Sequence, residues 1–255
     1  MNRSMRALAP WIDRLFGLAL AGTLAMAALT ALPGPALAAD TVVGSGQAAS
    51  EPRTVGEFNA IAVSGGIRLK VRQGPTAAVV VSADNNLLPL LETVVDGDKI
   101  LQLRWKKGSS LRTRSRASVD VVAPQLRAVS SSGSADIDLD TMKSPQLALS
   151  ISGSGDIRAR GLANDELSIA ISGSGDVQAA GQAGRLRVKI AGSGDVKTDA
   201  LQADDVSVRI AGSGDASVRA DKTLDVSVAG SGDVVYSGNA SVTHKVAGSG
   251  SVRKR

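Results

Sequence analysis

The chain has 255 residues, a formal net charge of +5 and no cysteine, and only 2% of its residues are aromatic. The absence of cysteine excludes disulfide bonds and a lipid-modified cysteine anchor, and so mild a charge does not indicate a nucleic-acid-binding protein. With so few aromatic side chains, the core must be built from Val, Ile, Leu and Ala.

The first 38 residues have the pattern of a secretory signal peptide. Arg3, Arg6 and Arg14 precede an apolar run from Leu15 to Leu32, and small residues follow at Ala36–Ala39. A basic start, an apolar stretch and an Ala-x-Ala exit predict cleavage near Ala38, whereas the alternative is a membrane anchor. Cleavage would leave a net charge of +3. No later apolar run is long enough to span a bilayer as a helix, so we expect a secreted or periplasmic protein.

Residues 39–53 are predicted to be a flexible lead-in, and strands are expected from residue 54. In the stretch 58–74, Ile67, Leu69 and Val71 alternate with basic residues, which is typical of a strand with one buried face. Residues 84–105 predict a short helical turn, then a turn at Asp96-Gly97 and a strand through Leu101 and Leu103. Residues 117–124 predict one more strand.

A repeat dominates the rest of the chain. Copies of Gly-Ser-x-Asp, the last reading Gly-Ser-Gly-Ser, are spaced by 20, 20, 19, 20, 18 and 18 residues and begin at Gly133, Gly153, Gly173, Gly192, Gly212, Gly230 and Gly248. Between the copies apolar and polar residues alternate with the period of a strand, as in Leu167, Ile169 and Ile171. Such short strands bury an apolar face when each coil stacks on the previous one.

The repeat therefore predicts an all-β protein with a single right-handed parallel β-solenoid, in coils of about 18–20 residues. The solenoid is expected over residues 54–250, with regular repeats over 130–250 and a basic tail at 251–255. Glycine adopts positive φ at no steric cost, and Ser and Asp can bond backbone N–H groups that a corner leaves unpaired. The motif is therefore interpreted as a structural corner.

Three features together resemble a known family. They are Phe58-x-x-Ile61-x-Val63-x-Gly65, the stretch SADNNLLPLLETVVDGDKILQL at 82–103, and the stacked Gly-Ser-Gly-Asp copies. Over residues 54–240 the chain resembles the head GIN domain family, labelled a putative auto-transporter adhesin. The resemblance implies a right-handed β-solenoid and an adhesin-like function.

The aspartates of the repeat form the first candidate site. In a solenoid they would lie in one row, about 5 Å apart: Asp136, Asp156, Asp176, Asp195, Asp215 and Asp233. A row of hydrogen-bonding caps is the favoured interpretation, and a weak cation-binding ridge is the alternative. Calcium prefers six to eight oxygen ligands, and one such corner per coil supplies few. No dedicated metal site and no cofactor is predicted. A scaffold stabilised by calcium is kept as a further hypothesis for the function of the protein.

A basic segment forms the second candidate site. Residues 104–116 contain no acidic residue, and the candidate partner-binding residues are Arg104, Trp105, Lys106, Lys107, Arg112, Arg114 and Arg116. Clustered cations attract anionic partners over a distance. A solvated loop is the favoured interpretation, and the alternative is contact with an envelope or host surface component, either an anionic glycan or a protein, and not with nucleic acid. The outward-facing Arg68, Lys70 and Arg72 would extend such a basic patch.

Catalytic patterns are sparse. His244 is the chain's one histidine and aligns with inward positions of earlier coils, and no cysteine or second histidine could complete a triad or zinc site. The sequence predicts a non-enzymatic, adhesin-like or cell-envelope interaction module that acts through its repeated surface. The alternative is a glycan-active β-solenoid lyase or hydrolase.

Overall fold

The computed structural model describes residues 41–255, so the predicted signal peptide at 1–38 lies outside the described residues. The described part is built from strands and one short 3-10 helix, and none of its helices has the length and apolar character needed to cross a membrane. The repeat region contains β10 (Ala128–Gly133), β11 (Asp136–Asp140), β12 (Lys143–Gly153), β13 (Asp156–Gly173), β14 (Val177–Gly192), β15 (Val196–Gly212), β16 (Ala216–Gly230), β17 (Val234–Ser237), β18 (Ser241–Gly248) and β19 (Val252–Lys254).

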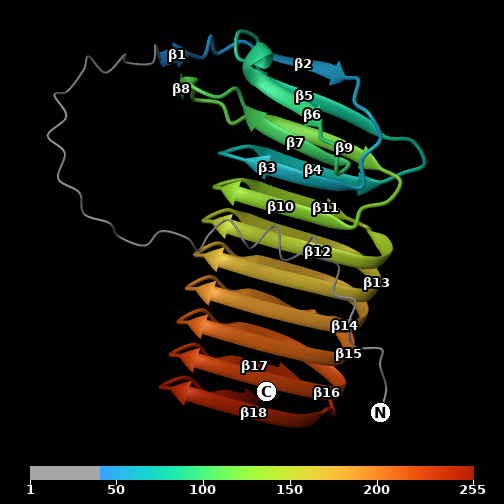
Figure 1. Ribbon diagram of the computed structural model, residues 1–255, viewed down its shortest axis with the longest axis vertical. Helices are drawn as coiled ribbons and strands as arrows, with labels where there is room; N and C mark the ends of the chain where they lie inside the picture. Colours follow the sequence, from blue (N-terminus) through green and yellow to red (C-terminus); the bar gives the residue numbers. More distant parts are fainter. Residues whose placement is uncertain (1–40) are drawn as a thin grey trace, which may run out of the picture. The chain divides into compact units, whose positions relative to one another are not determined.

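These strands stack in parallel, one coil on the next, and confirm the predicted β-solenoid (Figure 1); their register is continuous except for local shifts in the stretch from β13 to β16, after Ala159, Gln178, Thr198 and Ala203. Each coil has three sides. The first side leads into the Gly-Ser-x-Asp corner, the second side follows it, and the third side comprises 143–146, 163–166, 181–185, 201–205 and 219–223. Strands β13 to β16 run without interruption from the second side through the third to the first, because each backbone hydrogen-bonds to the coils beside it.

Inward-facing side chains form one continuous aliphatic core. Leu167, Ile169 and Ile171 are at most 2% exposed, and their register partners in the next coil, Leu186, Val188 and Ile190, are equally buried. Parallel stacking places equivalent residues about 4.8 Å apart, so each column of branched side chains packs against its copies. Alternation in the sequence is thereby converted into a core that is almost entirely aliphatic, with Phe58 as its one buried aromatic residue in the described chain.

The glycines of the corner allow the coils to approach closely. Gly192 has φ 131°, and a Cβ added there would lie 2.2 Å from the carbonyl oxygen of Gly173. That same carbonyl accepts the N–H of Ser193 at 2.9 Å. Only glycine combines this backbone conformation with so close a contact, which explains why the motif recurs.

The remaining strands form the other end of the stack. They are β1 (Thr41–Val43), β2 (Ala48–Arg53), β3 (Ala60–Ser64), β4 (Arg68–Gln73), β5 (Ala78–Asp84), β6 (Leu91–Val95), β7 (Ile100–Trp105), β8 (Ser110–Arg112) and β9 (Ser118–Ala123), with the 3-10 helix η1 (Leu88–Leu90) between β5 and β6. The coil of β3 and β4 pairs with β7 and β9 on one side and with β10 and β11 on the other. The short helical turn and the turn after Val95 agree with the sequence prediction.

The flexible lead-in predicted for residues 39–53 is wrong where the structure describes it. Strand β2 pairs antiparallel with β5, and β1 pairs in parallel with β8. Gly, Ser and Pro in this stretch gave a polar, loop-like pattern, but backbone pairing to β5 holds it in place. The antiparallel strands β2, β5 and β6 form a cap over the stack.

At the opposite end, β18 pairs with β16 and β19 with β17. His244 lies opposite Val226, as the alignment of coils predicts. Its side chain is nevertheless exposed, because no strand of the described chain pairs with β18 on its other edge.

Candidate functional site

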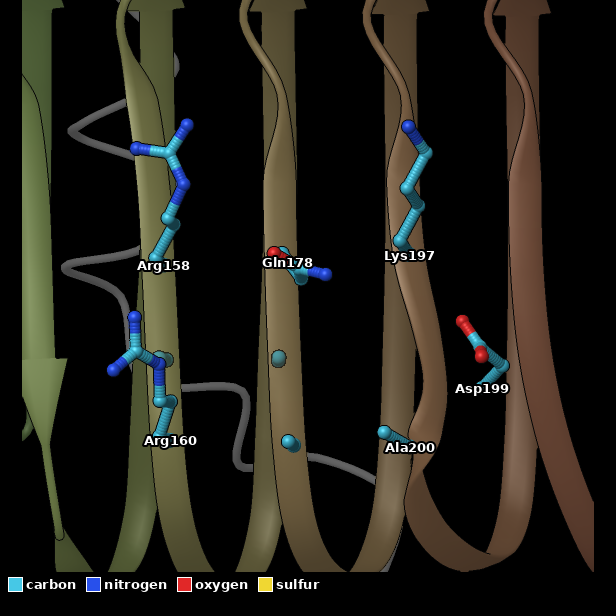
Figure 2. A pocket seen from close by; sticks show the side chains of 9 residues that line it. Arg158, Arg160, Gln178, Lys197, Asp199 and Ala200 are labelled. Carbon is cyan, nitrogen blue, oxygen red and sulfur yellow. The ribbon is translucent and has the colours of Figure 1, made fainter.

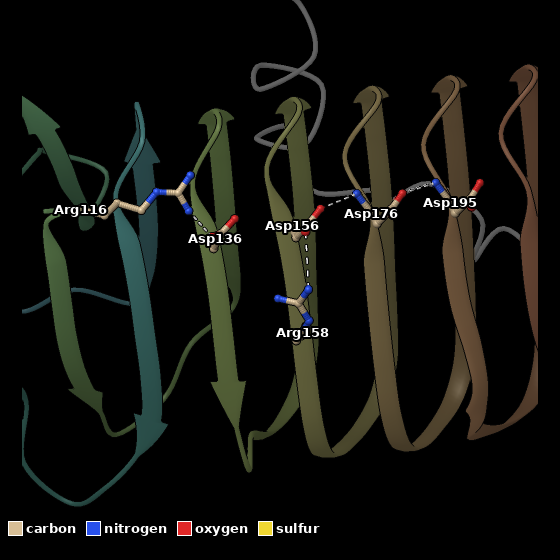
Figure 3. Close-up of polar contacts among 6 residues, drawn as sticks. All are labelled: Arg116, Asp136, Asp156, Arg158, Asp176 and Asp195. Atoms are coloured by element: carbon tan, nitrogen blue, oxygen red, sulfur yellow. Dashed lines mark hydrogen bonds and ion pairs between the residues drawn. The ribbon is translucent and has the colours of Figure 1, made fainter. Parts of the chain in front are cut away.

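The row of corner aspartates is brought together as predicted. Asp156, Asp176 and Asp195 lie on successive coils (Figure 3). The Oδ1 atom of Asp176 accepts the N–H of Asp195 at 2.9 Å, and Asp156 accepts the N–H of Asp176 at 3.3 Å. The same bond recurs from Asp195 to Asp233, where Ser251 donates both its N–H and its hydroxyl. Each carboxylate thus replaces a backbone carbonyl as the acceptor between coils.

The start of the row has a different partner. Asp136 forms an ion pair with Arg116, and Arg158 Nη2 lies 3.6 Å from Asp156 Oδ2 (Figure 3). Within residues 41–255 no group of three or more His, Cys, Asp or Glu side chains is positioned to hold a metal ion. The geometry supplies a hydrogen-bonding role for the carboxylates, and cation binding by the row stays a hypothesis.

Contacts divide the basic segment into residues with a structural role and cations that are exposed. Arg104 Nε lies 2.9 Å from Glu92 Oε2, and Arg116 pairs with Asp136. Trp105 is half-buried against the core, and its Cδ1 would lie 3.4 Å from a Cβ added at Gly65. These three residues therefore have structural contacts. The four exposed cations left for a partner are Lys106, Lys107, Arg112 and Arg114.

A carboxylate-rich depression lies on the third side. Two overlapping hollows of about 370 and 450 Å³ are lined by Asp165, Glu166, Asp204 and Asp205 among others. Glu166 forms ion pairs with Arg185 and Arg187, and Thr223 Oγ1 donates to Asp205 at 2.6 Å.

Asp204 is also engaged in this depression. Lys222 Nζ lies 3.0 Å from Asp204 Oδ2, and the hydrogen bond and charge of Asp204 raise the pKa of Lys222. A general acid needs a carboxyl group whose pKa is raised, usually by burial or by like charge. Three of the four carboxylates instead have a cation or a donor beside them, an arrangement that ties neighbouring coils together.

A separate hollow lies on the second side and was not predicted from the sequence. It occupies about 190 Å³ and is lined by side chains of β13, β14 and β15, including Arg158, Arg160 and Lys197 (Figure 2). The signal for it was present: the spacing from Gly173 to Gly192 is 19 residues, between two spacings of 20.

Charges on the second side also alternate from coil to coil. Arg68, Lys70 and Arg72 of β4 lie opposite Asp136, Asp138 and Asp140 of β11. Opposite charges in register attract weakly at an exposed surface. The basic face of β4 is therefore matched by an acidic neighbour and does not extend the basic segment.

Comparison with known proteins places the chain in a family. The family model described as "Putative auto-transporter adhesin, head GIN domain" matches residues 57–240, and the chain belongs to this family. No curated protein matches the chain.

Solved structures share the fold over nearly their whole length. A "putative lipid binding protein" from Parabacteroides distasonis is 25% identical, with a TM-score of 0.72, over 85% of this chain and 100% of its own. A "putative adhesin" from Parabacteroides merdae is 25% identical, with a TM-score of 0.69, over 85% and 99%. A "putative adhesin" from Bacteroides fragilis is 22% identical, with a TM-score of 0.78, over 84% and 100%.

Proposed function

We propose that the protein is a non-enzymatic, adhesin-like module that binds a component of the cell envelope or of a host surface through its repeated surface. The observation that carries this proposal is the regular surface formed by the stacked coils. Side chains of successive coils stand in unbroken register along the first side from β10 to β18, and the hollows over the other two sides are open and shallow. Extended, regular surfaces suit extended partners better than small substrates.

The relatives support a binding role. Those at 25% identity are named "putative adhesin" and "putative lipid binding protein", and both names describe binding. The predicted signal peptide supports a secreted or periplasmic location. Detection of the processed protein in periplasmic or extracellular fractions tests that location, and recovery of the unprocessed chain in the cytoplasm contradicts it.

A glycan-active enzyme is less well supported. The carboxylates of the third-side depression are largely committed to Arg185, Arg187, Lys222 and Thr223. Two carboxyl groups with separated pKa values, one of them raised, are the usual requirement for glycoside hydrolysis. Turnover of polysaccharides by the purified protein would reverse this preference.

The basic segment is the region we propose for contact with an anionic glycan or protein. Four exposed cations without an acid beside them attract anions, and salt screens that attraction. Replacing Lys106, Lys107, Arg112 and Arg114 by Gln should lower affinity for envelope fractions about tenfold, a loss of about 1.4 kcal/mol.

The matched control replaces four exposed cations elsewhere by Gln: Lys143, Lys189, Arg209 and Lys245. Binding is measured by retention of the immobilised protein's partners from envelope fractions and by glycan arrays at increasing salt. Equal losses in the two variants would remove the segment from the proposal, and absence of any wild-type binding would remove the adhesin-like function.

A further inference from the structure

One coil of the solenoid is shorter than its neighbours by one residue, and the register shows where. Ala159 pairs with Ala179, but Leu162 pairs with Gly181. On the other side Gln178 pairs with Lys197, whereas Gly181 pairs with Leu201. In the stretch that contains Ala180, the coil of β14 therefore has one residue fewer than each of the two coils beside it.

This local shortage produces the hollow on the second side. Its floor is formed by the small side chains around Ala179 and Ala180, and its volume is about 190 Å³. Arg158 and Arg160 stand on β13 and Lys197 on β15, with Gln178 between the two coils (Figure 2). The coil of β14 lies between β13 and β15, so the cations of the two outer strands are anchored two inter-strand spacings, or about 10 Å, apart.

The side chains that line the hollow have an excess of positive charge, and Arg158 and Arg160 also lie opposite Asp138 and Asp140 of β11 in register. Arg160 and Lys197 are exposed and have no acidic partner within ion-pair distance among residues 41–255. Arg158 has a long, exposed contact of 3.6 Å with Asp156, which contributes little in water. Asp199 is the one carboxylate on the rim. Three cations thus line a space large enough for an anionic group, and Lys197 is the one among them with no aspartate opposite it, since it lies between Gln178 and Ser217.

We propose that this cationic hollow binds a sulfate or phosphate ester carried on a saccharide. Guanidinium groups bond tetrahedral oxyanions through two N–H groups at once, and lysine adds a point charge. The amide of Gln178 and the carboxylate of Asp199 are placed on the rim, where they suit sugar hydroxyl groups. The inference rests on the proposed function, since it names the chemical class of the surface partner.

A saccharide suits the surroundings better than a bilayer. Proteins that dock on membranes usually insert apolar side chains as well as presenting cations. The large apolar side chains exposed in the described chain are Val43, Val80 and Val94, from β1, β5 and β6. None of them lines the hollow.

The test compares two variants that each lose two charges. Arg160→Gln with Lys197→Gln removes cations of the hollow, and Lys189→Gln with Arg209→Gln removes a pair on the first side, directly opposite one another in register. Affinity of the full chain for a heparin-derived hexasaccharide is measured by calorimetry. We expect a loss of about tenfold or more for the hollow variant, or about 1.4 kcal/mol, and less than threefold for the control.

A third variant fills the hollow and leaves its charges in place. Ala180→Leu should reduce hexasaccharide binding as strongly as the double variant, while thermal unfolding shows that the fold persists. Equal losses in the hollow and first-side variants, or unchanged binding by Ala180→Leu in a folded protein, would overturn the proposal.

Two further probes identify the source of the anion. A desulfated hexasaccharide should bind at least tenfold more weakly, and vesicles containing phosphatidylglycerol should not compete. Binding to vesicles in place of the hexasaccharide would overturn the saccharide assignment. Binding to envelope fractions without binding to the hexasaccharide would overturn this inference and leave the adhesin-like function standing, whereas loss of both would reject the two together.

Discussion

At the scale of single residues, the corner glycines are fixed by two independent constraints. Gly192 has a positive φ, and its missing Cβ would overlap the carbonyl of Gly173. Gly194 shows the second constraint by itself, because a Cβ there would lie 2.1 Å from the carbonyl oxygen of Gly175. Backbone from the adjacent coil occupies the space that any side chain would need.

Gly192→Ala should therefore destabilise the protein by at least about 2 kcal/mol, through backbone strain and displacement of the adjacent coil. The control is Gly56→Ala, where φ is not positive and no atom lies within 4 Å of the added Cβ. That variant should stay within about 0.5 kcal/mol of the wild type. Urea unfolding measures both, and equal midpoints would contradict the stacking argument.

The corner aspartates lead to a second prediction at this scale. Asp195→Ala leaves the N–H of Asp215 without the acceptor that it has at 3.0 Å, at a cost of about 1 kcal/mol. Asp195→Asn keeps an acceptor oxygen and also removes a like charge about 5 Å from its neighbours. The Asn variant should match or exceed the wild type in urea unfolding. If Asn is as harmful as Ala, the negative charge itself is required.

At the scale of elements, the hairpin of β6 and β7 depends on an acidic turn residue. Burial works against ionisation of Asp96, but hydrogen bonds from the Gln102 side chain and from the N–H groups of Ile100 and Asp98 outweigh it and lower the Asp96 pKa. The bond from Gln102 is 2.9 Å long, and the two from N–H groups are 3.0 Å.

A lowered pKa in the folded state gives a definite sign to the pH dependence. The stabilisation by Asp96 is fully present above the pKa of the unfolded chain, near 4, and is lost as pH falls through the lower folded value. Asp96→Asn cannot ionise, so its stability deficit relative to the wild type should shrink between pH 6 and pH 3. Urea unfolding at the two pH values measures this deficit, and a deficit that grows in acid would contradict the assignment.

Much of the fold could be predicted at the scale of the repeat, because one spacing is repeated and each copy carries the same alternation. The third side could not: residues such as Asn164, Asp165 and Glu166 resemble a loop, and only pairing with adjacent coils makes them strand. The cap was also hidden, since β2 and β5 pair across a long separation in sequence.

The candidate sites were predictable to different degrees. The aspartate row follows from the spacing alone, so its residues were found. The contacts of Arg104 and Arg116 come from Glu92 and Asp136, which no local pattern connects to them. The hollow required the 19-residue spacing to be placed in register against its neighbours.

At the scale of the whole molecule, the question is whether ions or aliphatic packing hold the coils together. The core runs through the stack, and the aspartates from Asp156 to Asp233 each accept an N–H from the next coil. A calcium-stabilised scaffold would instead gain stability with ligand concentration.

We therefore expect the thermal unfolding midpoint to be the same in 1 mM EDTA and in about 10 mM Ca²⁺, a level about ten times the dissociation constant of the weaker extracellular calcium sites. Differential scanning calorimetry makes the comparison, with Mg²⁺ at equal ionic strength as the control. A rise in the midpoint specific to Ca²⁺ would contradict this expectation, and its loss in Asp176→Asn with Asp195→Asn would assign the ion to the aspartate row.

The glycine columns also govern how a protein of this kind can change in length. A residue added at a corner would bring a Cβ or a shifted carbonyl against the next coil, where the spacing leaves no room. A complete extra coil brings its own glycine and its own acceptor, and so reproduces every contact that it interrupts. Duplication of a gene segment that encodes one or more whole coils should thus lengthen the stack without loss of contacts. The length of the binding surface would then increase by whole coils.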